Sequence, residues 1–350
     1  MKMESGLSIP TNSSPEVGKV NVVGLPHLVT VRNLTRMQME AWMTRADTLR
    51  QMSRRDRNAL HSGAVVATLF YEPSTRTRLS FETAVLQLGG QVIGAENAKE
   101  NSSAKKGETL ADVVRVVGAY ADVIVIRHHD AEAFREATRF SPVPLVSAGA
   151  GDGEHPTQAM LDIYTMMREL GRIDGLHIAI LGDLKYGRTV HSLLWVLTRF
   201  RGVRVSLLPE PGFSLPQEEL RLLSKAGLTL QIATQVETLF PTVDVVYQTR
   251  IQRERLQDEE ASGFPGDTNR TLTTGSIATT AGCSVGTLNI GIAELQLLPH
   301  HAKIMHPLPR VGEIDPAIDE DPRAAYFRQV ENGLYMRMAI LDQLLGGQGL

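Results

Sequence analysis

The sequence predicts an α/β protein with two domains, each a parallel β-sheet flanked by helices. Short apolar runs rich in β-branched residues alternate with segments of helical periodicity, as in parallel sheets that are covered on both faces. The 350 residues are too many for one ordinary domain and suit two. No repeat of short, fixed period is visible, which argues against a solenoid or a propeller.

The continuous apolar runs predict strands, and the periodic segments predict helices. The strands span residues 64–70, 123–127, 143–147, 177–182, 204–208, 229–233, 243–249 and 303–306. The helices span residues 75–88, 156–170, 189–200, 216–226 and 333–345. Ligands of parallel sheets bind beyond the carboxyl ends of the strands, so the residues that follow each strand are the candidates for a site.

A glycine-rich segment at residues 149–153, just before the helix that opens at Pro156, is where we place the change of domain. We expect the first domain over residues 21–156 and the second over residues 157–331. A C-terminal helix within residues 332–350 is expected to cross back and complete the first domain.

Two further segments are predicted to lie outside these domains. Residues 1–20 are polar and lack the apolar core of a signal peptide, which predicts a disordered tail. Residues 271–293 carry no charge, but their Thr, Gly, Ser and Asn content is too polar for a membrane span. We interpret them as part of a surface loop inserted near residues 265–295.

Composition limits the classes of function. The net charge of −3 gives no global field that would attract nucleic acid or an acidic membrane, so any anion site must be built locally. The single cysteine, Cys283, excludes an intramolecular disulfide and fits a reducing compartment. We therefore expect a cytoplasmic protein without nucleic-acid or membrane partners.

The residues after the first strand predict an anion site at the N-terminus of a helix. Ser74, Thr75 and Thr77 supply hydroxyls, and the first helical turn supplies backbone N–H groups and the positive end of the helix dipole. Arg76 adds planar donors that match phosphate oxygens. A capped helix with a solvated arginine is the commoner meaning of Ser-Thr-Arg. The anion site is favoured here because two arginines and three hydroxyls directly follow a buried strand.

Other strand ends carry similar groups. Arg127 ends the second predicted strand, and Pro156 orients a helix N-terminus that presents His155 and Gln158. A histidine beside an edge rich in anion donors is a candidate for polarising a carbonyl. The loop at residues 102–108 contains two lysines and is a second basic element. A segment of this composition, taken alone, is more often a solvated loop without a binding role.

The second half repeats this pattern. Polar or cationic segments follow its strands at residues 183–189, 249–255 and 306–310. A glycine-containing turn after a strand often indicates dinucleotide binding, but no G-x-G-x-x-G motif is present. Each motif is modest alone, whereas six at successive strand ends, mostly cationic, predict one anion-binding constellation.

At this point the sequence resembles the aspartate carbamoyltransferase family, specifically its catalytic chains. The resemblance runs from about residue 25 to residue 345. It rests on the blocks FYEPSTRTRLSFE, KKGETLADV, EHPTQAMLDIYT, GDLKYGRTVHSL, TRIQRERL, MHPLPR and DPRAAYFRQVENGLYMRMA, in this order. Between Leu256 and His306 the chain is about twenty residues longer than the family pattern, which leaves the alignment of the inserted loop open.

The resemblance implies roles for individual residues. The phosphate of carbamoyl phosphate would bind to Ser74, Thr75, Arg76, Thr77 and Arg127. The carbamoyl oxygen would accept hydrogen bonds from Thr77, Arg127 and His155. The carbamoyl NH2 would donate to Gln158 and to the carbonyls of Pro307 and Leu308, with Pro309 shaping that wall. The two carboxylates of aspartate would bind Arg188, Arg250 and Gln252, near Leu308 and Lys106.

The family also implies a shared site and a closing contact. Ser102 and Lys106 would reach the active site of a neighbouring subunit, which implies a homotrimer. Glu72 would pair with Arg188 and Arg255 across the domain gap and hold the closed arrangement. The chain has no room for a fused synthetase or dihydroorotase, but association with a regulatory chain or with other enzymes of the pathway stays open.

The implied reaction is direct displacement of phosphate by the amine of L-aspartate, without a metal, a cofactor or a covalent enzyme intermediate. It would yield N-carbamoyl-L-aspartate in the second step of de novo pyrimidine biosynthesis. Two alternatives stay open. An ornithine carbamoyltransferase would carry a cysteine in place of Pro307 and lack the arginine-rich clamp. A non-catalytic carbamoyl-phosphate-binding scaffold would show losses at the key positions, and we find none.

Overall fold

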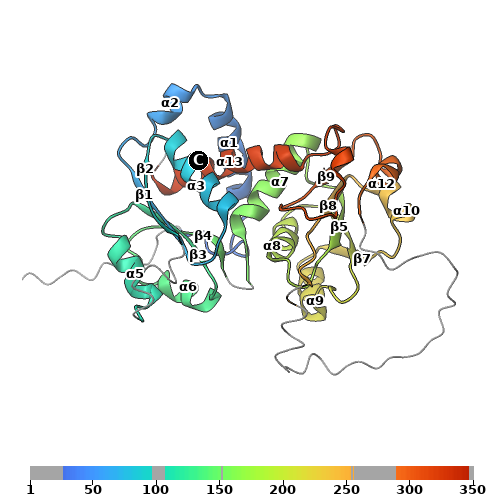
Figure 1. Ribbon diagram of the computed structural model, residues 1–350, viewed down its shortest axis with the longest axis horizontal. Coiled ribbons are helices and arrows are strands. Elements are labelled where there is room, and N and C mark those ends of the chain that lie inside the picture. Colours follow the sequence, from blue (N-terminus) through green and yellow to red (C-terminus); the bar gives the residue numbers. More distant parts are fainter. Residues whose placement is uncertain (1–26, 97–106, 151–152, 254, 256–288, 347–350) are drawn as a thin grey trace, which may run out of the picture.

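The protein is described by a computed structural model that covers residues 27–96, 107–150, 153–253, 255 and 289–346. Two parallel sheets stand side by side, and helices cover both of them (Figure 1). This arrangement confirms the predicted α/β class with two parallel sheets. Among the described helices, none has the length and the hydropathy that crossing a bilayer requires.

The first sheet has the strand order β2-β1-β3-β4, and every pair is parallel. Its strands are β1 (Val65–Phe70), β2 (Gln91–Glu96), β3 (Val123–His128) and β4 (Leu145–Ala150). β1, β3 and β4 are almost entirely buried, as their apolar runs predict. β2 was not predicted, because it is an edge strand whose residues Gln91, Ile93 and Gly94 are exposed and give no continuous apolar run.

The second sheet has the order β7-β6-β5-β8-β9 and is also parallel throughout. Its strands are β5 (His177–Gly182), β6 (Arg204–Pro209), β7 (Thr229–Ile232), β8 (Val245–Gln248) and β9 (Lys303–Met305). The bounds of β5 agree with the prediction. β8 is shorter than predicted by two residues at its amino end and one at its carboxyl end, and β9 is shorter by one residue at its carboxyl end.

Helices connect the strands and cover the sheets. The predicted helices appear as α3 (Thr75–Gln87), α7 (Pro156–Leu170), α8 (Arg188–Leu197), α9 (Gln217–Lys225) and α13 (Tyr326–Leu344). The others were not predicted: α1 (Arg36–Gln51), α2 (Arg54–Asn58), α5 (Leu110–Val117), α6 (Ala131–Ala137), α10 (Val236–Leu239) and α12 (Ile292–Leu297), with 3-10 turns at Phe240–Thr242 and Pro316–Ile318. α1 had a readable start signal, since Thr35 and Gln38 form a capping box.

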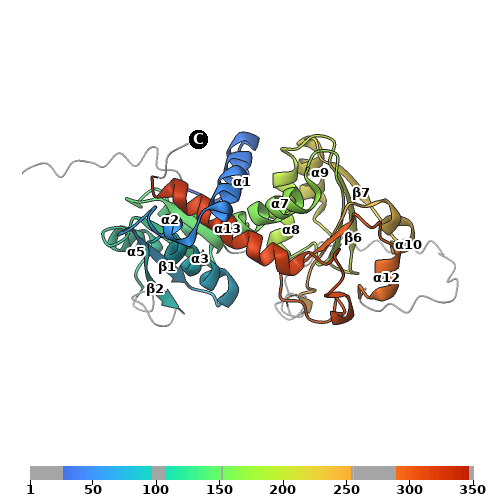
Figure 2. The ribbon, with the colours of Figure 1, turned by 90° about the horizontal axis from the view of Figure 1, so that it is seen from above.

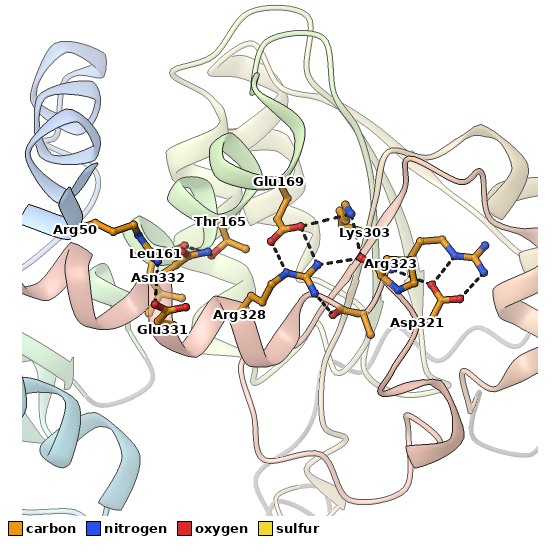
Figure 3. A network of polar contacts seen from close by, with 12 residues as sticks. Arg50, Leu161, Thr165, Glu169, Lys303, Asp321, Arg323, Arg328, Glu331 and Asn332 are labelled. Carbon is orange, nitrogen blue, oxygen red and sulfur yellow. Dashed lines mark hydrogen bonds and ion pairs between the residues drawn. The ribbon is translucent and has the colours of Figure 1, made fainter. Parts of the chain in front are cut away.

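The last helix joins the two halves. α13 begins beside β9, where Ala325 N donates to Ile304 O at 2.8 Å, and then crosses to pack on α7, α1 and α3 (Figure 2). Arg328 on α13 forms two hydrogen bonds of 2.7 and 2.8 Å with Glu169 at the end of α7 (Figure 3). One turn further along α13, Asn332 donates to Thr165 at 3.2 Å.

A continuous apolar core follows the same route. The largest cluster of buried apolar side chains includes Val66 of the first sheet, Tyr164 of α7, Met338 of α13 and Val245 of the second sheet. Burial of apolar surface is the main favourable term in folding. The two halves are therefore held together by shared core as well as by the polar contacts of α13.

Candidate active site

The strand order places the site. In the first sheet the order reverses between β1 and β3, and in the second sheet it reverses between β5 and β8. Ligands of such sheets bind at these switch points, beyond the carboxyl ends of the strands. The segments that follow β1, β5 and β8 carry Ser74 to Thr77, Arg188, and Arg250 with Gln252, and Arg127 lies at the carboxyl end of β3 itself. The two switch points therefore hold most of the predicted site.

One cleft of about 510 Å³ collects these residues. Arg76 of the first half and Arg188 of the second half both line it, although they come from different sheets. The predicted site residues in its lining are Ser74, Thr75, Arg76, Thr77, Arg127, His155, Gln158, Arg188, Arg250, Gln252, Pro307, Leu308 and Pro309. A volume of this size suits a small-molecule ligand.

The N-terminus of α3 forms one wall of the cleft. Ser74 is the N-cap residue, but its side chain makes no capping hydrogen bond within the described chain. The hydroxyls of Ser74 and Thr75 and the N–H groups of the first turn therefore remain at the positive end of the helix dipole. Partial burial lowers the pKa of Arg76, which stays cationic near neutral pH. This wall can bind an anion.

Arg127 extends from the end of β3 into the cleft. Its Nη1 donates to the carbonyl of Ala148 at 3.1 Å, which fixes the plane of the guanidinium. Burial, together with the positive charge of Arg188, lowers its pKa to about 10, and the charge of Glu72 acts against this shift. Gly149 has φ 115°, and a Cβ there would lie 2.9 Å from Arg127 Nη1. Only glycine adopts this positive φ readily and also leaves room for the guanidinium of Arg127.

Glu72 bridges the two halves. One of its carboxylate oxygens lies 3.4 Å from Arg127 Nε and 3.4 Å from Arg188 Nη1. This acidic side chain offsets the repulsion between two cations that face the same cleft. The structure thus places Glu72 next to Arg188, and the closing role that the family resemblance implies for Glu72 stays a prediction. The guanidinium carbon of Arg255 lies 5.8 Å from the centre of the Tyr186 ring.

His155 and Gln158 occupy the N-terminal turn of α7, where Pro156 begins the helix. His155 is 7% exposed, and its backbone N–H donates to Ser192 at 2.8 Å. Burial, followed by the charges of Arg127, Arg337 and Arg188, holds the pKa of His155 well below its usual value. The imidazole is therefore neutral at pH 7, and it can donate an N–H without adding a charge to the cleft.

The turn after β5 is organised by Asp183, a residue that the sequence analysis did not single out. Asp183 is fully buried and accepts hydrogen bonds from the backbone N–H groups of Lys185, at 3.0 Å, and Tyr186, at 2.8 Å. Its other oxygen accepts from Gln252 Nε2 at 3.0 Å. Asp183 therefore holds the loop that leads into Arg188 and fixes the side chain of Gln252.

The loop after β9 is held by His306. Its Nε2 lies 2.7 Å from Glu313, and its Nδ1 accepts a hydrogen bond from the backbone N–H of Leu308 at 2.8 Å. Leu308 has φ 56°, an unusual conformation for a residue with a branched side chain. Such a conformation persists where the surroundings impose it, and it occurs here in the wall of the cleft.

Comparison with known proteins identifies the family of the fold. The carbamoyl-P binding domain of the aspartate/ornithine carbamoyltransferases matches residues 26–168, and their Asp/Orn binding domain matches residues 174–344. This chain belongs to the aspartate/ornithine carbamoyltransferase family.

The relatives of this chain within the family include aspartate carbamoyltransferases. The catalytic subunit of Methanopyrus kandleri is 44% identical over 325 residues, which cover 91% of this chain and 97% of that protein. The catalytic subunit of the M. jannaschii enzyme, a solved structure, is 39% identical with a TM-score of 0.77 and covers 91% of this chain and 97% of its own. The Trypanosoma cruzi enzyme in complex with carbamoyl phosphate and aspartate is 35% identical with a TM-score of 0.77, covering 92% of this chain and 96% of its own.

Several predicted site residues and segments lie outside the described part of the chain. These are Ser102 and Lys106, the tail at residues 1–20, and most of the insertion near residues 265–295. Within the described residues, no group of three or more His, Cys, Asp or Glu side chains is arranged to hold a metal ion.

The structure adds cleft residues that the sequence analysis missed. Arg337 of α13 is buried at the cleft and donates from Nη1 to Ser80 at 2.9 Å. Burial lowers its pKa to about 10, against the opposing charge of Asp162. Gln329, also on α13, lines the cleft too. Both residues sit inside a helix, so no motif at a strand end could have revealed them.

Proposed function

We propose that this chain transfers the carbamoyl group of carbamoyl phosphate to the amine of L-aspartate, releasing N-carbamoyl-L-aspartate and phosphate. The observation that carries this proposal is the shared cleft, in which an anion-binding helix terminus of one half faces the cationic segments of the other. This is the second step of de novo pyrimidine biosynthesis. We assign carbamoyl phosphate to the first half and aspartate to the second.

The first half suits carbamoyl phosphate. The phosphate oxygens fit the N-terminal turn of α3 and the guanidinium of Arg76, because hydroxyls, N–H groups and charge converge there. The carbamoyl oxygen then lies toward Thr77, Arg127 and His155, whose donors stabilise the negative charge that grows during attack. The carbamoyl NH2 faces acceptors, namely Gln158 and the carbonyls of Pro307 and Leu308.

The second half suits the dicarboxylate. Arg188, Arg250 and Gln252 line the same cleft and would bind the two carboxylates of aspartate. The neutral amine then attacks the carbamoyl carbon, the C–O bond to phosphate breaks, and the leaving phosphate takes the amine proton. Positioning of two bound reactants and prearranged donors would supply most of the acceleration.

Ornithine is the rival acceptor, since the family includes both activities. The family resemblance implies a cysteine in place of Pro307 in ornithine enzymes, and the cationic lining of the second half suits a dicarboxylate better than the diamino acid ornithine. The test is an assay of carbamoyl product with carbamoyl phosphate and either amine. Product from aspartate alone is expected. Product from ornithine alone, or from neither amine, would overturn the proposal.

We further propose a homotrimer in which Ser102 and Lys106 complete the site of a neighbouring subunit. Support comes from α3, where Leu79 and Leu86 are 56% and 59% exposed and lie seven positions apart on one face of the helix, which suits a contact with another subunit. Mixing Lys106→Ala and His155→Ala chains after dissociation tests this. Hybrid trimers should regain activity, because some sites then contain neither substitution. No recovery would contradict the sharing of sites.

The remaining expectations on assembly and location are also proposals. A cytoplasmic location is supported by the single cysteine, Cys283, and cell fractionation would test it. Association with a regulatory chain or with other enzymes of the pathway would appear as a larger mass in solution when the candidate partners are added.

A further inference from the structure

A fully buried carboxyl group lies directly behind the cleft. Asp162, on the second turn of α7, accepts three hydrogen bonds from three different elements. Its Oδ1 accepts from Gln158 Nε2 at 2.9 Å and from Gln329 Nε2 at 2.7 Å. Its Oδ2 accepts from the hydroxyl of Tyr247, on β8, at 2.8 Å. None of the roles proposed above uses Asp162.

This contact decides which end of the Gln158 amide faces the cleft. An ionised carboxylate only accepts hydrogen bonds, so it holds the NH2 group of Gln158 and directs the carbonyl Oε1 away from itself. Gln158 lines the cleft, and no side-chain hydrogen bond to its Oε1 occurs within the described chain. An amide without this anchor could present either end to a ligand. An NH2 group that faced the carbamoyl NH2 would repel it.

The same carboxyl group also fixes the opposite acceptor wall. Gln329 donates to Asp162 through its NH2, and its Oε1 accepts the backbone N–H of His306 at 2.9 Å. His306 in turn accepts the N–H of Leu308, whose carbonyl is a proposed acceptor. Both acceptor walls, one on α7 and one on the loop after β9, are thus positioned from Asp162.

We propose that Asp162 is a positioning residue that orients the Gln158 amide with its carbonyl toward the cleft. It thereby sets the hydrogen-bond acceptor that recognises the carbamoyl NH2 of the substrate. This inference rests on the proposed function and deepens it. Asp162 does not touch the reacting atoms and acts through Gln158.

The charges around Asp162 add a measurable signature. Burial raises the pKa of Asp162 to about 7, while hydrogen bonds from Tyr247, Gln329 and Gln158, and the charge of Arg337, act against this rise. Burial also raises the pKa of Tyr247 well above its usual value, so Tyr247 stays neutral. His155 at the start of α7 is neutral, and Arg337 on α13 is cationic, as described above. His306 faces this group only through Gln329.

Protonation of Asp162 would change the orientation that it imposes. A carboxylic acid carries an O–H that must donate, so one of the three donors has to turn or leave. If Gln158 turns, its NH2 enters the cleft. Activity should therefore fall as the pH drops through about 7. Asp162→Asn should remove this acidic limb, because asparagine does not titrate.

A double-mutant cycle between Asp162 and Gln158 tests the proposal. Asp162→Ala is expected to lower kcat/KM for carbamoyl phosphate by about tenfold, the effect of losing one hydrogen bond of ordinary strength. In the Gln158→Ala background the same change should cost clearly less than in the native background, because one of the two acceptors that Asp162 orients is already absent. Equal losses in the two backgrounds would overturn the proposal, since a purely structural role would act in both.

Two further variants keep the test decisive if Asp162→Ala folds poorly. Asp162→Asn can place its oxygen toward both glutamines and its NH2 toward the Tyr247 oxygen, so activity near pH 8 should stay within about threefold of the native chain. A loss as large as that of Asp162→Ala would contradict the proposal. Tyr247→Phe is the matched control, because it removes one partner of Asp162 but leaves the Gln158 contact. It should lower the free energy of unfolding but leave kcat/KM nearly unchanged.

The proposed function and the positioning role of Asp162 can be tested separately. If the native chain forms no carbamoyl product from aspartate, the proposed function fails. If the native chain is active but the losses at Asp162 and Gln158 multiply independently, only the positioning role of Asp162 fails.

Discussion

Replacing His155 by alanine isolates one donor of the cleft. The ring is 7% exposed and lines the cleft beside Arg127, and its Nδ1 is enclosed without a hydrogen-bond partner among the described residues. The substitution removes a neutral N–H donor and leaves the net charge of the cleft unchanged at pH 7, because the pKa of His155 is held well below its usual value. Phosphate binding should therefore change little.

The size of the effect follows from the role of the donor. Losing one donor at a developing oxyanion costs roughly 2.7–4 kcal/mol in the barrier, or about 10²–10³ in kcat. Arg127 and Thr77 remain, and Arg127 is cationic, so we place the loss near the lower end, at about hundredfold. The neutral state of the imidazole also means that titration of His155 should not shape the pH profile above its depressed pKa.

The assay is steady-state formation of carbamoyl aspartate at saturating aspartate, together with thermal protection by phosphate. His61→Ala is the matched control: His61 is also largely buried, pairs with Asp342 at 2.9 Å and does not line the cleft. The control should lose stability but keep kcat. Unchanged kcat in His155→Ala, or a loss confined to phosphate affinity, would refute the role given to His155.

Three other predictions concern charge and backbone. Glu72→Gln should raise KM for aspartate more than KM for carbamoyl phosphate, because the bridge between Arg127 and Arg188 loses its charge; steady-state kinetics that match the native chain for aspartate would contradict this. Gly149→Ala should weaken carbamoyl phosphate binding, because the new Cβ would lie 2.9 Å from Arg127 Nη1, and unaltered ligand titration would argue against it. His191 is buried, which lowers its pKa, yet the ion pair with Glu219 prevails and raises it. Because the pKa of His191 is higher in the folded state than in the unfolded state, protonation stabilises the native state fully at a pH below the unfolded pKa. This stabilisation is lost as the pH rises through the folded pKa, so His191→Gln should lower Tm more at about pH 6 than at about pH 9. A constant difference in Tm across that range would count against this pair.

Much of the fold was predictable where local signals and tertiary structure agree. α7 has the predicted bounds, because Pro156 suits its first position and Gly171 ends it with φ 70°. β5 is a continuous apolar run that ends at Gly182. β2 lacked such a signal, since its place at the edge of the sheet is fixed by pairing with β1 and not by its own residues.

The site likewise contains residues that the sequence could predict and residues that it could not. Residues next to strand ends, such as Arg127 and Arg188, were predictable because parallel strands bring their carboxyl ends to one edge. Arg337 and Asp162 lie inside helices and reach the cleft region only through packing between α7 and α13. A weak signal existed: each is a charged residue within a run of apolar residues in its helix. A buried charged residue is uncommon without a partner of opposite charge. Here the negative charge of Asp162 favours the cationic form of Arg337.

The crossing of α13 bears on how the protein is made. A ribosome releases the first sheet long before residues 326–344, yet those residues supply Arg337, Gln329 and part of the apolar core beneath that sheet. A nascent chain halted ahead of α13 would expose that apolar surface and would lack the cleft residues Arg337 and Gln329. Synthesis of the final helix is therefore the step that completes both the cleft and the core beneath the first sheet.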